Sequence, residues 1–335
     1  MFMIKINLGA DISKETIDFF CDANSELFQL KNNAKGLDKL LMWADQHQYP
    51  LNQIAIAFEH TGHYGNVLVD FCVQHEITFY HVPALEIKKS LGITRGKNDQ
   101  IDAKRICAYL KEKGYKLTPT KPVNDAIERL KHLQAQRALF VRNSASIKNV
   151  LKDQLEVLVI SKEDFLVRTN MQMIQQFEKS IKEIDDEIQK MVEADKEIKK
   201  NYNHIISITG IGKVIAIDTI IATHNFTKFN NWRQYASYCG CAPFEYSSGK
   251  FIGKPRISKL ANKELKAHLN SGALSAIKFD NECKMYFERK LKEGKTKKCI
   301  TNVIRCKLIA RMYAVVKQNR PFEKNYAHSL EGKVS

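Results

Sequence analysis

The chain has 335 residues, 44% of them hydrophobic, and its formal net charge at pH 7 is +16. This composition excludes a disordered tail and predicts a folded basic protein large enough for two domains, with nucleic acid as the leading partner class. No apolar run approaches the roughly 18 residues of a membrane-spanning helix, and the start of the chain lacks a signal-peptide pattern, so we expect a cytoplasmic protein without a membrane partner.

The first part of the chain alternates strands with helices, which is typical of a mixed α/β domain, and we place this domain at residues 1–118. Helices are expected near residues 37–44, 67–72 and 101–110 because of their apolar spacing. The expected strands are Met3–Leu8, Thr16–Cys21, Glu26–Leu30, Ile54–Phe58 and Ile77–Val82. Asp11 follows the first strand, and Glu59 follows the fourth, which is apolar enough to be buried.

A basic stretch, Arg95–Arg105, carries two carboxylates, Asp99 and Asp102, at the expected start of the last helix of this domain. A spacing of three residues puts both on one helical face, where a cation could bridge them. Neighbouring cations could hold a phosphodiester backbone, and these are Lys97, Lys104 and Arg105. The alternative is structural: Asn98 or Asp99 caps the helix, and Asp102 favours its first turn through the helix dipole.

Asp11, Glu59, Asp99 and Asp102 together suit a divalent-metal site, because Mg²⁺ takes oxygen ligands held at rigid positions. Two ions roughly 3.5–4 Å apart would serve the attacking and leaving oxygens of a phosphodiester. We expect Mg²⁺ as the cofactor, and the ligand types suit Mn²⁺ as well. Taken singly, Asp11 could be a turn residue and Glu59 a helix-start acid. Other acids are less well placed, including Asp18, Asp70 and Glu86.

Residues 119–201 are predicted to form a long helical connector after the breaks at Pro119 and Pro122. Its second helix carries a heptad seam with charged residues between the apolar ones. The seam consists of Ile174, Phe177, Ile181, Ile184, Ile188 and Met191. Two such helices would pack as an antiparallel hairpin within the chain or pair with a second copy as a coiled coil. The second arrangement would give a homo-oligomer, a dimer or a tetramer.

Residues 202–335 are predicted to form a mainly helical, strongly basic domain. The turn Thr209–Lys213 resembles a helix-hairpin-helix element whose backbone amides hold a phosphate, although its glycines could serve a steric purpose alone. Ser248–Lys266 contains six lysines or arginines and one acid, and residues 281–335 contain fourteen and five. Such concentration favours phosphate contact over a solvated basic face. The expected contacts are Lys213, Lys250, Lys254, Arg256, Lys259 and Lys263.

The eight cysteines include no C-x-x-C pair, and most lie in apolar segments. We therefore expect reduced core thiols rather than disulfides. Cys239 and Cys241 would need distant partners to bind zinc, so no zinc site is predicted.

The motifs of the first domain resemble the RuvC-like DEDD domain of insertion-sequence transposases related to the Piv invertase. They are Asp11 after a strand, Glu59–Gly62 after a strand, and Lys97–Ala103. The later motifs are similar to that family's transposase domain, and they are Ile208–Gly212, Tyr235–Pro243 and Ser247–Lys250. The resemblance covers nearly the whole chain in the right order. It implies an α/β RuvC/RNase H-like N-terminal domain, a long helical connector and a mainly α C-terminal transposase domain.

The resemblance also implies chemical roles. Asp11, Glu59, Asp99 and Asp102 would be the DEDD metal ligands, and a serine before a glycine would be the nucleophile that forms a covalent phosphoserine–DNA intermediate. Ser248 matches that serine, with Ser247 as the fallback. The family implies a site assembled between protomers and guided by a noncoding RNA that pairs with target and donor DNA. On composition alone, Ser247–Gly249 is an ordinary polar turn.

Three functions are consistent with these patterns. The first is a metal-dependent DNA recombinase with a serine nucleophile. The second is a RuvC-like, junction-specific nuclease in which water attacks and no covalent intermediate forms. The third is a noncatalytic nucleic-acid-binding protein whose acids are helix caps. Four well-placed acids followed by an ordered second set of motifs favour the recombinase.

Overall fold

The structure is a computed structural model that describes residues 6–59, 62–90, 99–120, 124–249 and 251–323. In the hairpin of residues 244–256, the side chains of residues 245, 252 and 254–256 also lie outside the description. The chain divides into two compact units, Met1–Pro122 and Val123–Ser335, which are taken in turn.

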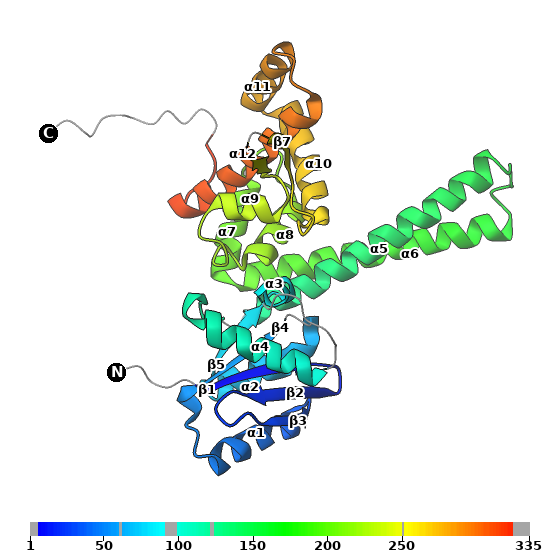
Figure 1. Cartoon of the computed structure of the whole chain (residues 1–335). Helices are drawn as coiled ribbons and strands as arrows, with labels where there is room; N and C mark the ends of the chain where they lie inside the picture. The colour runs from blue at the N-terminus through cyan, green and yellow to red at the C-terminus, as the bar shows by residue number, and fades with distance from the viewer. Residues whose placement is uncertain (1–5, 60–61, 91–98, 121–123, 250, 324–335) are drawn as a thin grey trace. The chain divides into compact units, whose positions relative to one another are not determined.

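The first unit contains a five-stranded mixed sheet (Figure 1). The strands are β1 (Ile6–Ile12), β2 (Thr16–Cys21), β3 (Leu27–Lys31), β4 (Ile54–Glu59) and β5 (Thr78–Val82), in the spatial order β3-β2-β1-β4-β5. The first three form an antiparallel meander, whereas β1, β4 and β5 run parallel. The mixed α/β prediction for this part of the chain is therefore confirmed. One boundary was wrong: β1 continues to Ile12, so Asp11 lies inside the strand rather than after it.

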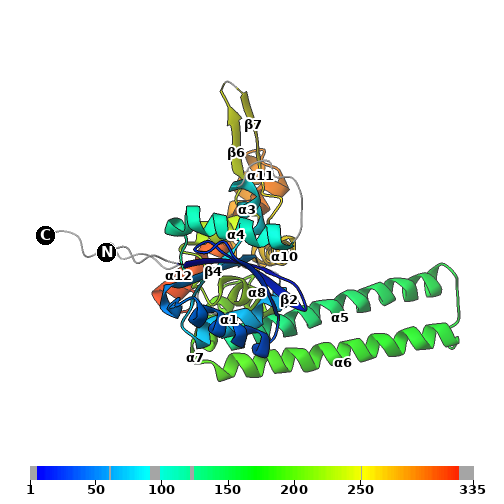
Figure 2. The ribbon, with the colours of Figure 1, turned by 60° about the horizontal axis from the view of Figure 1, so that its bottom comes forward.

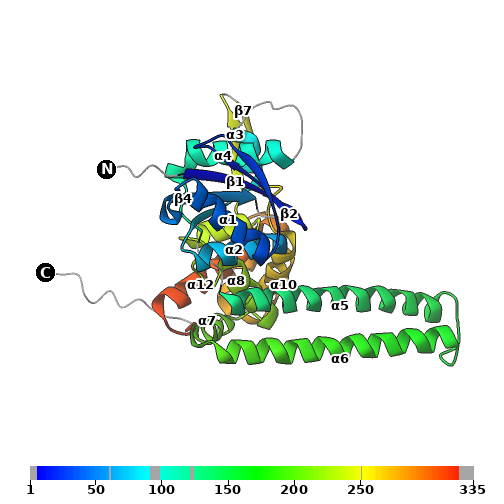
Figure 3. The same ribbon diagram turned by 90° about the horizontal axis from the view of Figure 1, so that it is seen from below.

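Helices cover both faces of this sheet (Figure 3). The elements on one side are α1 (Ala34–Gln46) and α2 (Asn66–Gln74), and those on the other are α3 (Ala84–Ser90) and α4 (Asp99–Lys113). Short 3-10 turns occur at Leu51–Gln53, Gly62–Gly65 and Gly114–Lys116. Successive side chains of β4 point to opposite faces of the sheet, so this strand contributes to the core on each face. Ile56 and Phe58 pack with α1 and α2, while Ala55 and Ala57 face α4.

Gly9 fixes how closely α4 approaches β1. A Cβ at this position would lie 2.1 Å from the carbonyl oxygen of Ala103 and 2.4 Å from the amide nitrogen of Cys107. The Cys107 thiol also donates to the carbonyl of Asn7, at 3.2 Å. The second and third turns of α4, at Ala103 and Cys107, therefore rest directly on the strand that carries Asp11.

We expect Gly9→Ala to lower the free energy of unfolding by about 2–3 kcal/mol, because the methyl group must push α4 away from β1. Chemical denaturation followed by circular dichroism measures the change. Gly114→Ala is the matched control, since its Cβ would meet only the Leu110 Cδ1 atom, at 3.4 Å. Equal effects of the two substitutions would contradict this account of the contact.

The second unit begins with an antiparallel helical hairpin, α5 (Asp125–Glu156) and α6 (Phe165–Ala194), which pack along their length (Figures 2 and 3). The predicted heptad seam lies in this packing: Ile174 and Ile188 are buried, and the Phe177 ring is centred 5.5 Å from that of Phe140. An ion pair of 2.6 Å between Arg137 Nε and Asp185 Oδ1 adds to it. The seam therefore serves packing within the chain.

The rest of the second unit is mainly helical and shares one core with the base of that hairpin. Its elements are α7 (Lys196–Ile206), α8 (Lys213–Thr223), α9 (Trp232–Tyr238), β6 (Phe244–Ser248), β7 (Phe251–Arg256), α10 (Lys263–Phe279), α11 (Asn281–Lys292) and α12 (Lys297–Gln318). The eight cysteines are free thiols, and six of them are buried, as predicted. Within the described parts of the chain, no helix has the length and apolar character needed to cross a membrane.

Candidate active site

Three separate segments of the first unit bring carboxylates to one edge of the sheet. Asp11 is near the end of β1, and Glu59 is the last residue of β4, the parallel neighbour of β1. Ala10 pairs with Phe58 in this register, so each acid follows a paired residue and the two lie side by side. Helix α4 begins with Asp99 and carries Asp102 in its first turn.

The electrostatics of Asp11 show that these acids are close together. Its pKa is raised from 3.8 to about 6, first by burial and then by repulsion from Asp99, Asp102, Glu59 and Asp18. The other three predicted ligands thus add to one negative potential at Asp11, and the four acids are called the carboxylate cluster. Among the described residues, no three His, Cys, Asp or Glu side chains are arranged to hold a metal ion.

Arg105 is the ion-pair partner of Asp102, with 2.8 Å between Nη1 and Oδ1, and both side chains are largely buried. The sequence predicted Arg105 as a nucleic-acid contact, and here it neutralises a predicted metal ligand. Lys104 is exposed, with its Nζ 5.5 Å from the centre of the Phe20 ring. Asp99 is exposed as well, and Lys97 lies outside the described residues.

Asp18 is a fifth acid of the cluster, which the sequence analysis ranked below the others. It lies directly opposite Asp11 in the β1–β2 register and is 4% exposed. The Nε2 atom of Gln29 donates to both of its carboxylate oxygens, at 3.0 Å. The signal that could have found it is the short turn between two strands, which places Asp11 and Asp18 opposite each other.

Asn32 ties together the two loops that follow Asp11 and Glu59. Its Nδ2 atom donates to the carbonyl oxygen of Ser13, at 2.8 Å, and to that of Tyr64, at 2.9 Å. Because Ser13 follows Asp11 by two residues and Tyr64 follows Glu59 by five, this amide limits the separation of the two strand ends. No sequence pattern pointed to Asn32, because its role depends on contacts far apart in the chain.

The candidate serines of the second unit lie in a β-hairpin rather than in an irregular polar turn. Ser248 is the last residue of β6 and pairs with Phe251 across a two-residue turn, in which Gly249 adopts a left-handed conformation with φ of 56°. Both Ser247 and Ser248 are exposed, and Figure 2 shows the hairpin standing out from the helices of its unit. Successive residues face opposite sides, so the two serines present their hydroxyls to different surroundings.

Aromatic side chains accompany Ser248 on its face of the hairpin. Tyr246 pairs with Gly253 there, and its ring is centred 6.3 Å from that of Phe251. Both rings are exposed, as is that of Phe244. Three of the predicted nucleic-acid contacts belong to this hairpin. The backbones of Lys254 and Arg256 lie in β7, but their side chains are not described, and Lys250 lies outside the described residues.

The other predicted cations of this unit are exposed at helix starts and in a loop. Lys213 is the first residue of α8, Lys263 is the first of α10, and Lys259 precedes α10. The glycine turn before α8 packs tightly on α10, because a Cβ at Gly210 would lie 2.5 Å from the carbonyl oxygen of Gly272. This steric requirement accounts for Gly210 without a phosphate ligand.

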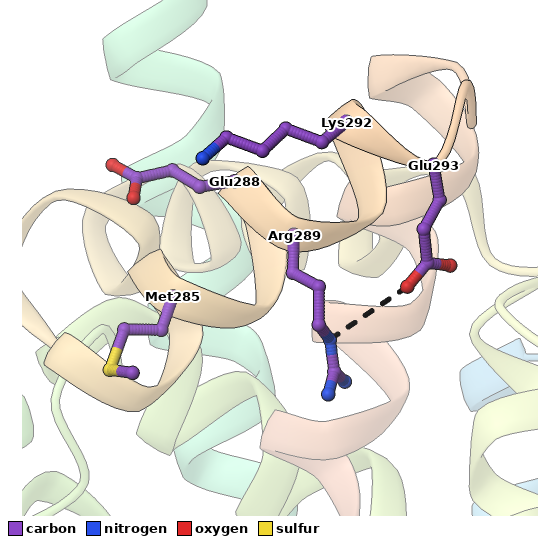
Figure 4. A pocket seen from close by; sticks show the side chains of 5 residues that line it. All are labelled: Met285, Glu288, Arg289, Lys292 and Glu293. Atoms are coloured by element: carbon purple, nitrogen blue, oxygen red, sulfur yellow. Dashed lines mark ion pairs between the residues drawn. The ribbon is translucent and has the colours of Figure 1, made fainter.

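A hollow of about 420 Å³ lies on α11 (Figure 4). Its lining residues are Met285, Glu288, Arg289, Lys292 and Glu293, of which Arg289 and Glu293 form an ion pair of 3.9 Å. None of the predicted site residues lines it, and it is open rather than enclosed.

Two transposase family profiles match the chain, and the first extends past Pro122 into the second unit. Residues 8–160, which include the four carboxylates, match a family profile described as Transposase, and residues 202–288, which include both serines, match one described as Transposase IS116/IS110/IS902 family. The chain is similar to the pilin gene-inverting proteins of Moraxella bovis and Moraxella lacunata. Each is 30% identical to it over 332 residues, covering 96% of this chain and 99% of the relative.

The chain is therefore an enzyme of DNA transposition and recombination. It belongs to the IS116/IS110/IS902 family of transposases, which confirms the family predicted from the sequence motifs.

Proposed function

We propose that this transposase exchanges DNA strands by combining a Mg²⁺ site on its RuvC/RNase H-like first unit with a serine nucleophile on its second. The observation that carries the proposal is the geometry of one sheet edge. The β1–β4 register sets Asp11 beside Glu59, and α4, which begins with Asp99 and Asp102, packs on β1 at Gly9. The raised pKa of Asp11 is consistent with this gathering of acids. Helix caps alone give no reason for such a gathering. The antiparallel meander followed by two parallel strands supports a RuvC-like fold for this unit.

The donor chemistry of the cluster suits the proposed cofactor. Asp11, Glu59, Asp99 and Asp102 offer only carboxylate oxygens, which Mg²⁺ prefers and Mn²⁺ also takes. When bound, the ion would lower the pKa of an attacking hydroxyl and stabilise charge on the leaving oxygen. Asp102 would have to share its charge between the ion and Arg105, whose guanidinium offsets part of the negative charge of the carboxylates.

We propose Ser248 as the nucleophile, with Ser247 as the fallback. Its Oγ would attack a DNA phosphorus, lose its proton, and form a phosphoserine ester while the bond from phosphorus to the leaving sugar oxygen breaks and that oxygen takes a proton. An exposed position at a hairpin end suits attack on a large substrate. The carboxylates and the serine belong to different compact units, and the family resemblance implies a working site assembled between protomers.

The proposed partners are target and donor DNA, a noncoding guide RNA and further copies of the chain as a dimer or tetramer. The net charge of +16 supports binding to nucleic acid. The two Moraxella relatives are named for inverting a gene, and strand exchange without free ends would allow this chain to invert DNA as well.

The structure leads to a prediction about Asn32. Asn32→Asp places a carboxylate against the carbonyl oxygens of Ser13 and Tyr64, so the two loops should separate. We expect the Mg²⁺ concentration for half-maximal strand cleavage to rise about tenfold, as is typical when a group that orients metal ligands is lost. Asn24→Asp is the control, because its side chain bonds only within the β2–β3 turn. An unchanged Mg²⁺ requirement would show that Asn32 has no part in placing the ligands.

The proposed function is tested by purifying the chain from its host without nuclease treatment, sequencing the bound nucleic acid, and adding DNA that matches it. We expect one discrete RNA and joined DNA strands that form only with Mg²⁺ present. Free 3′ and 5′ ends without joining would favour the junction nuclease. Binding without any Mg²⁺-dependent change in the DNA would favour a noncatalytic protein.

A further inference from the structure

Arg305 is a buried cation of the second unit without an acidic partner. It lies on α12 and is 9% exposed. Its Nη2 atom donates to Asn302 Oδ1, at 2.8 Å, but its Nε atom is buried without an acceptor. Among the described residues, no carboxylate forms an ion pair with it.

Arg311, on the same helix and also 9% exposed, shows the usual arrangement for comparison. Its guanidinium forms an ion pair of 2.7 Å with Asp280 and a second one with Glu282. A buried charge is ordinarily paired in this way, because its removal from water is unfavourable. The unpaired state of Arg305 therefore calls for an explanation other than packing.

The contacts of Arg305 place it at the base of the β6–β7 hairpin. Asn302, which accepts from Arg305, donates in turn to the carbonyl oxygen of Cys241, at 2.8 Å. Cys241 precedes Phe244, the first residue of β6, by three residues. The guanidinium is thus held, through one amide, to the segment that leads into the strand carrying Ser248.

A second cation, Lys266 of α10, lies at the same place. A Cβ added at Gly240 would be 3.7 Å from Lys266 Cδ. Both Arg305 and Lys266 act to lower the pKa of the Cys241 thiol, although burial is the larger effect and raises this pKa to about 11. In the described part of the chain, Lys266 also forms no ion pair. Two uncompensated cations therefore meet where the hairpin joins the helical core.

We propose that Arg305, assisted by Lys266, binds a phosphodiester group of the nucleic acid at the base of the β6–β7 hairpin. A guanidinium offers a planar fork of donors that matches two phosphate oxygens, and lysine adds a point charge. Asn302 would hold the fork in position before the ligand arrives. The inference rests on the proposed function. It adds a fixed contact between the protein and the nucleic-acid backbone, close to the strand that presents Ser248. The phosphodiester belongs to DNA or to RNA, which share this chemistry.

The test compares the wild type with Arg305→Met, Arg305→Lys and Lys266→Met. Fluorescence anisotropy measures binding of a labelled DNA duplex and of a labelled RNA hairpin at several KCl concentrations. Arg305→Met should weaken binding about tenfold and reduce the slope of log K against log [KCl] by about one. Arg305→Lys should recover the slope but only part of the affinity. The nucleic acid whose slope changes identifies the source of the phosphate.

Thermal unfolding separates this role from a structural one. Removing an unpaired buried charge should leave the melting temperature of Arg305→Met unchanged or raise it, while binding falls. Arg168→Met is the control, because Arg168 is exposed on α6, and it should leave the affinity within about twofold. A lower melting temperature together with unchanged affinity and slope would overturn the proposal.

Two further outcomes are distinguishable. If Arg305→Met does not fold, the other two variants decide. Wild-type affinity and salt slope in both Arg305→Lys and Lys266→Met would overturn the proposal. Weaker nucleic-acid binding by Lys266→Met would support it. If the wild type itself binds neither DNA nor RNA, the proposed function fails. Normal binding by the wild type and by all variants refutes only the site at Arg305.

Discussion

Ser248→Ala should abolish the covalent attachment of DNA to the protein, and it should lower strand exchange by at least about 10⁴-fold. The methyl group of alanine cannot form a phosphate ester, and the remaining serine of the pair, Ser247, faces the other side of the hairpin. DNA and RNA binding should stay within about twofold of wild type, because one exposed hydroxyl at a hairpin end contributes little to packing. A denaturing gel of the reaction products with labelled DNA measures the adduct.

Ser247→Ala is a closely matched control for this change. Ser247 is equally exposed and adjacent, but it pairs with Ile252 and faces the other side of the hairpin. It should retain the adduct. Loss of the adduct in Ser247→Ala with retention in Ser248→Ala would move the nucleophile to Ser247. Retention in both variants would reject a covalent step through either serine.

Asp11→Asn should lower the rate of strand exchange by at least about 10³-fold. The same substitution should raise the free energy of unfolding of the metal-free protein. The pKa of Asp11 in the folded protein is about 6, above its ordinary value of 3.8. The folded chain therefore binds more protons than the unfolded chain between these pH values, and the ionised carboxylate destabilises the fold as pH rises. Asparagine cannot ionise, so it avoids that repulsion and also offers no negative charge to Mg²⁺.

The stability gain should depend on pH in a definite direction. It should be absent below about pH 4, grow between pH 4 and 6, and level off above pH 6 at about 1–2 kcal/mol, a range reduced for the partial exposure of Asp11. Denaturation in EDTA at pH 3.5, 5 and 7.5 measures it. Asp70→Asn is the control, since Asp70 is exposed on α2 and should show neither effect. A loss of stability at pH 7.5 would contradict the electrostatic account of the cluster.

Local elements were predictable wherever the apolar pattern was strong. The predicted bounds of β2 match the structure, and α4 begins at Asp99, as the acid-rich start of that segment indicated. The end of β1 was misplaced because Gly9 interrupts the apolar run, whereas the backbone continues as a strand and uses the missing side chain to admit α4. The end of this strand is decided by packing between β1 and α4, and the local sequence does not contain that information.

The composition of the carboxylate cluster was only partly predictable. Strand ends and a helix start indicated Asp11, Glu59, Asp99 and Asp102, and repulsion from the other three acids contributes to the raised pKa of Asp11. Asp18 was not predicted as a member of the cluster. Its closeness to Asp11 follows from the register of the β1–β2 hairpin, which cannot be read from the strand positions alone.

The remaining features depend on contacts across the fold. Ser248 could be selected only through the family resemblance, since a polar Ser-Ser-Gly segment is common in turns. Arg305 could not be selected at all from the sequence, because its significance is the absence of an acidic partner among its described neighbours.

The most direct test of the account is mass spectrometry of the protein–DNA adduct, formed with Mg²⁺, quenched with detergent, and digested with nuclease and trypsin. The tryptic peptide of residues 234–250 contains both candidate serines, and fragment ions distinguish them. We predict a nucleotide phosphate on Ser248, present with Mg²⁺ and absent in Asp11→Asn. A reaction that joins DNA strands while this peptide stays unmodified would contradict the proposed covalent mechanism.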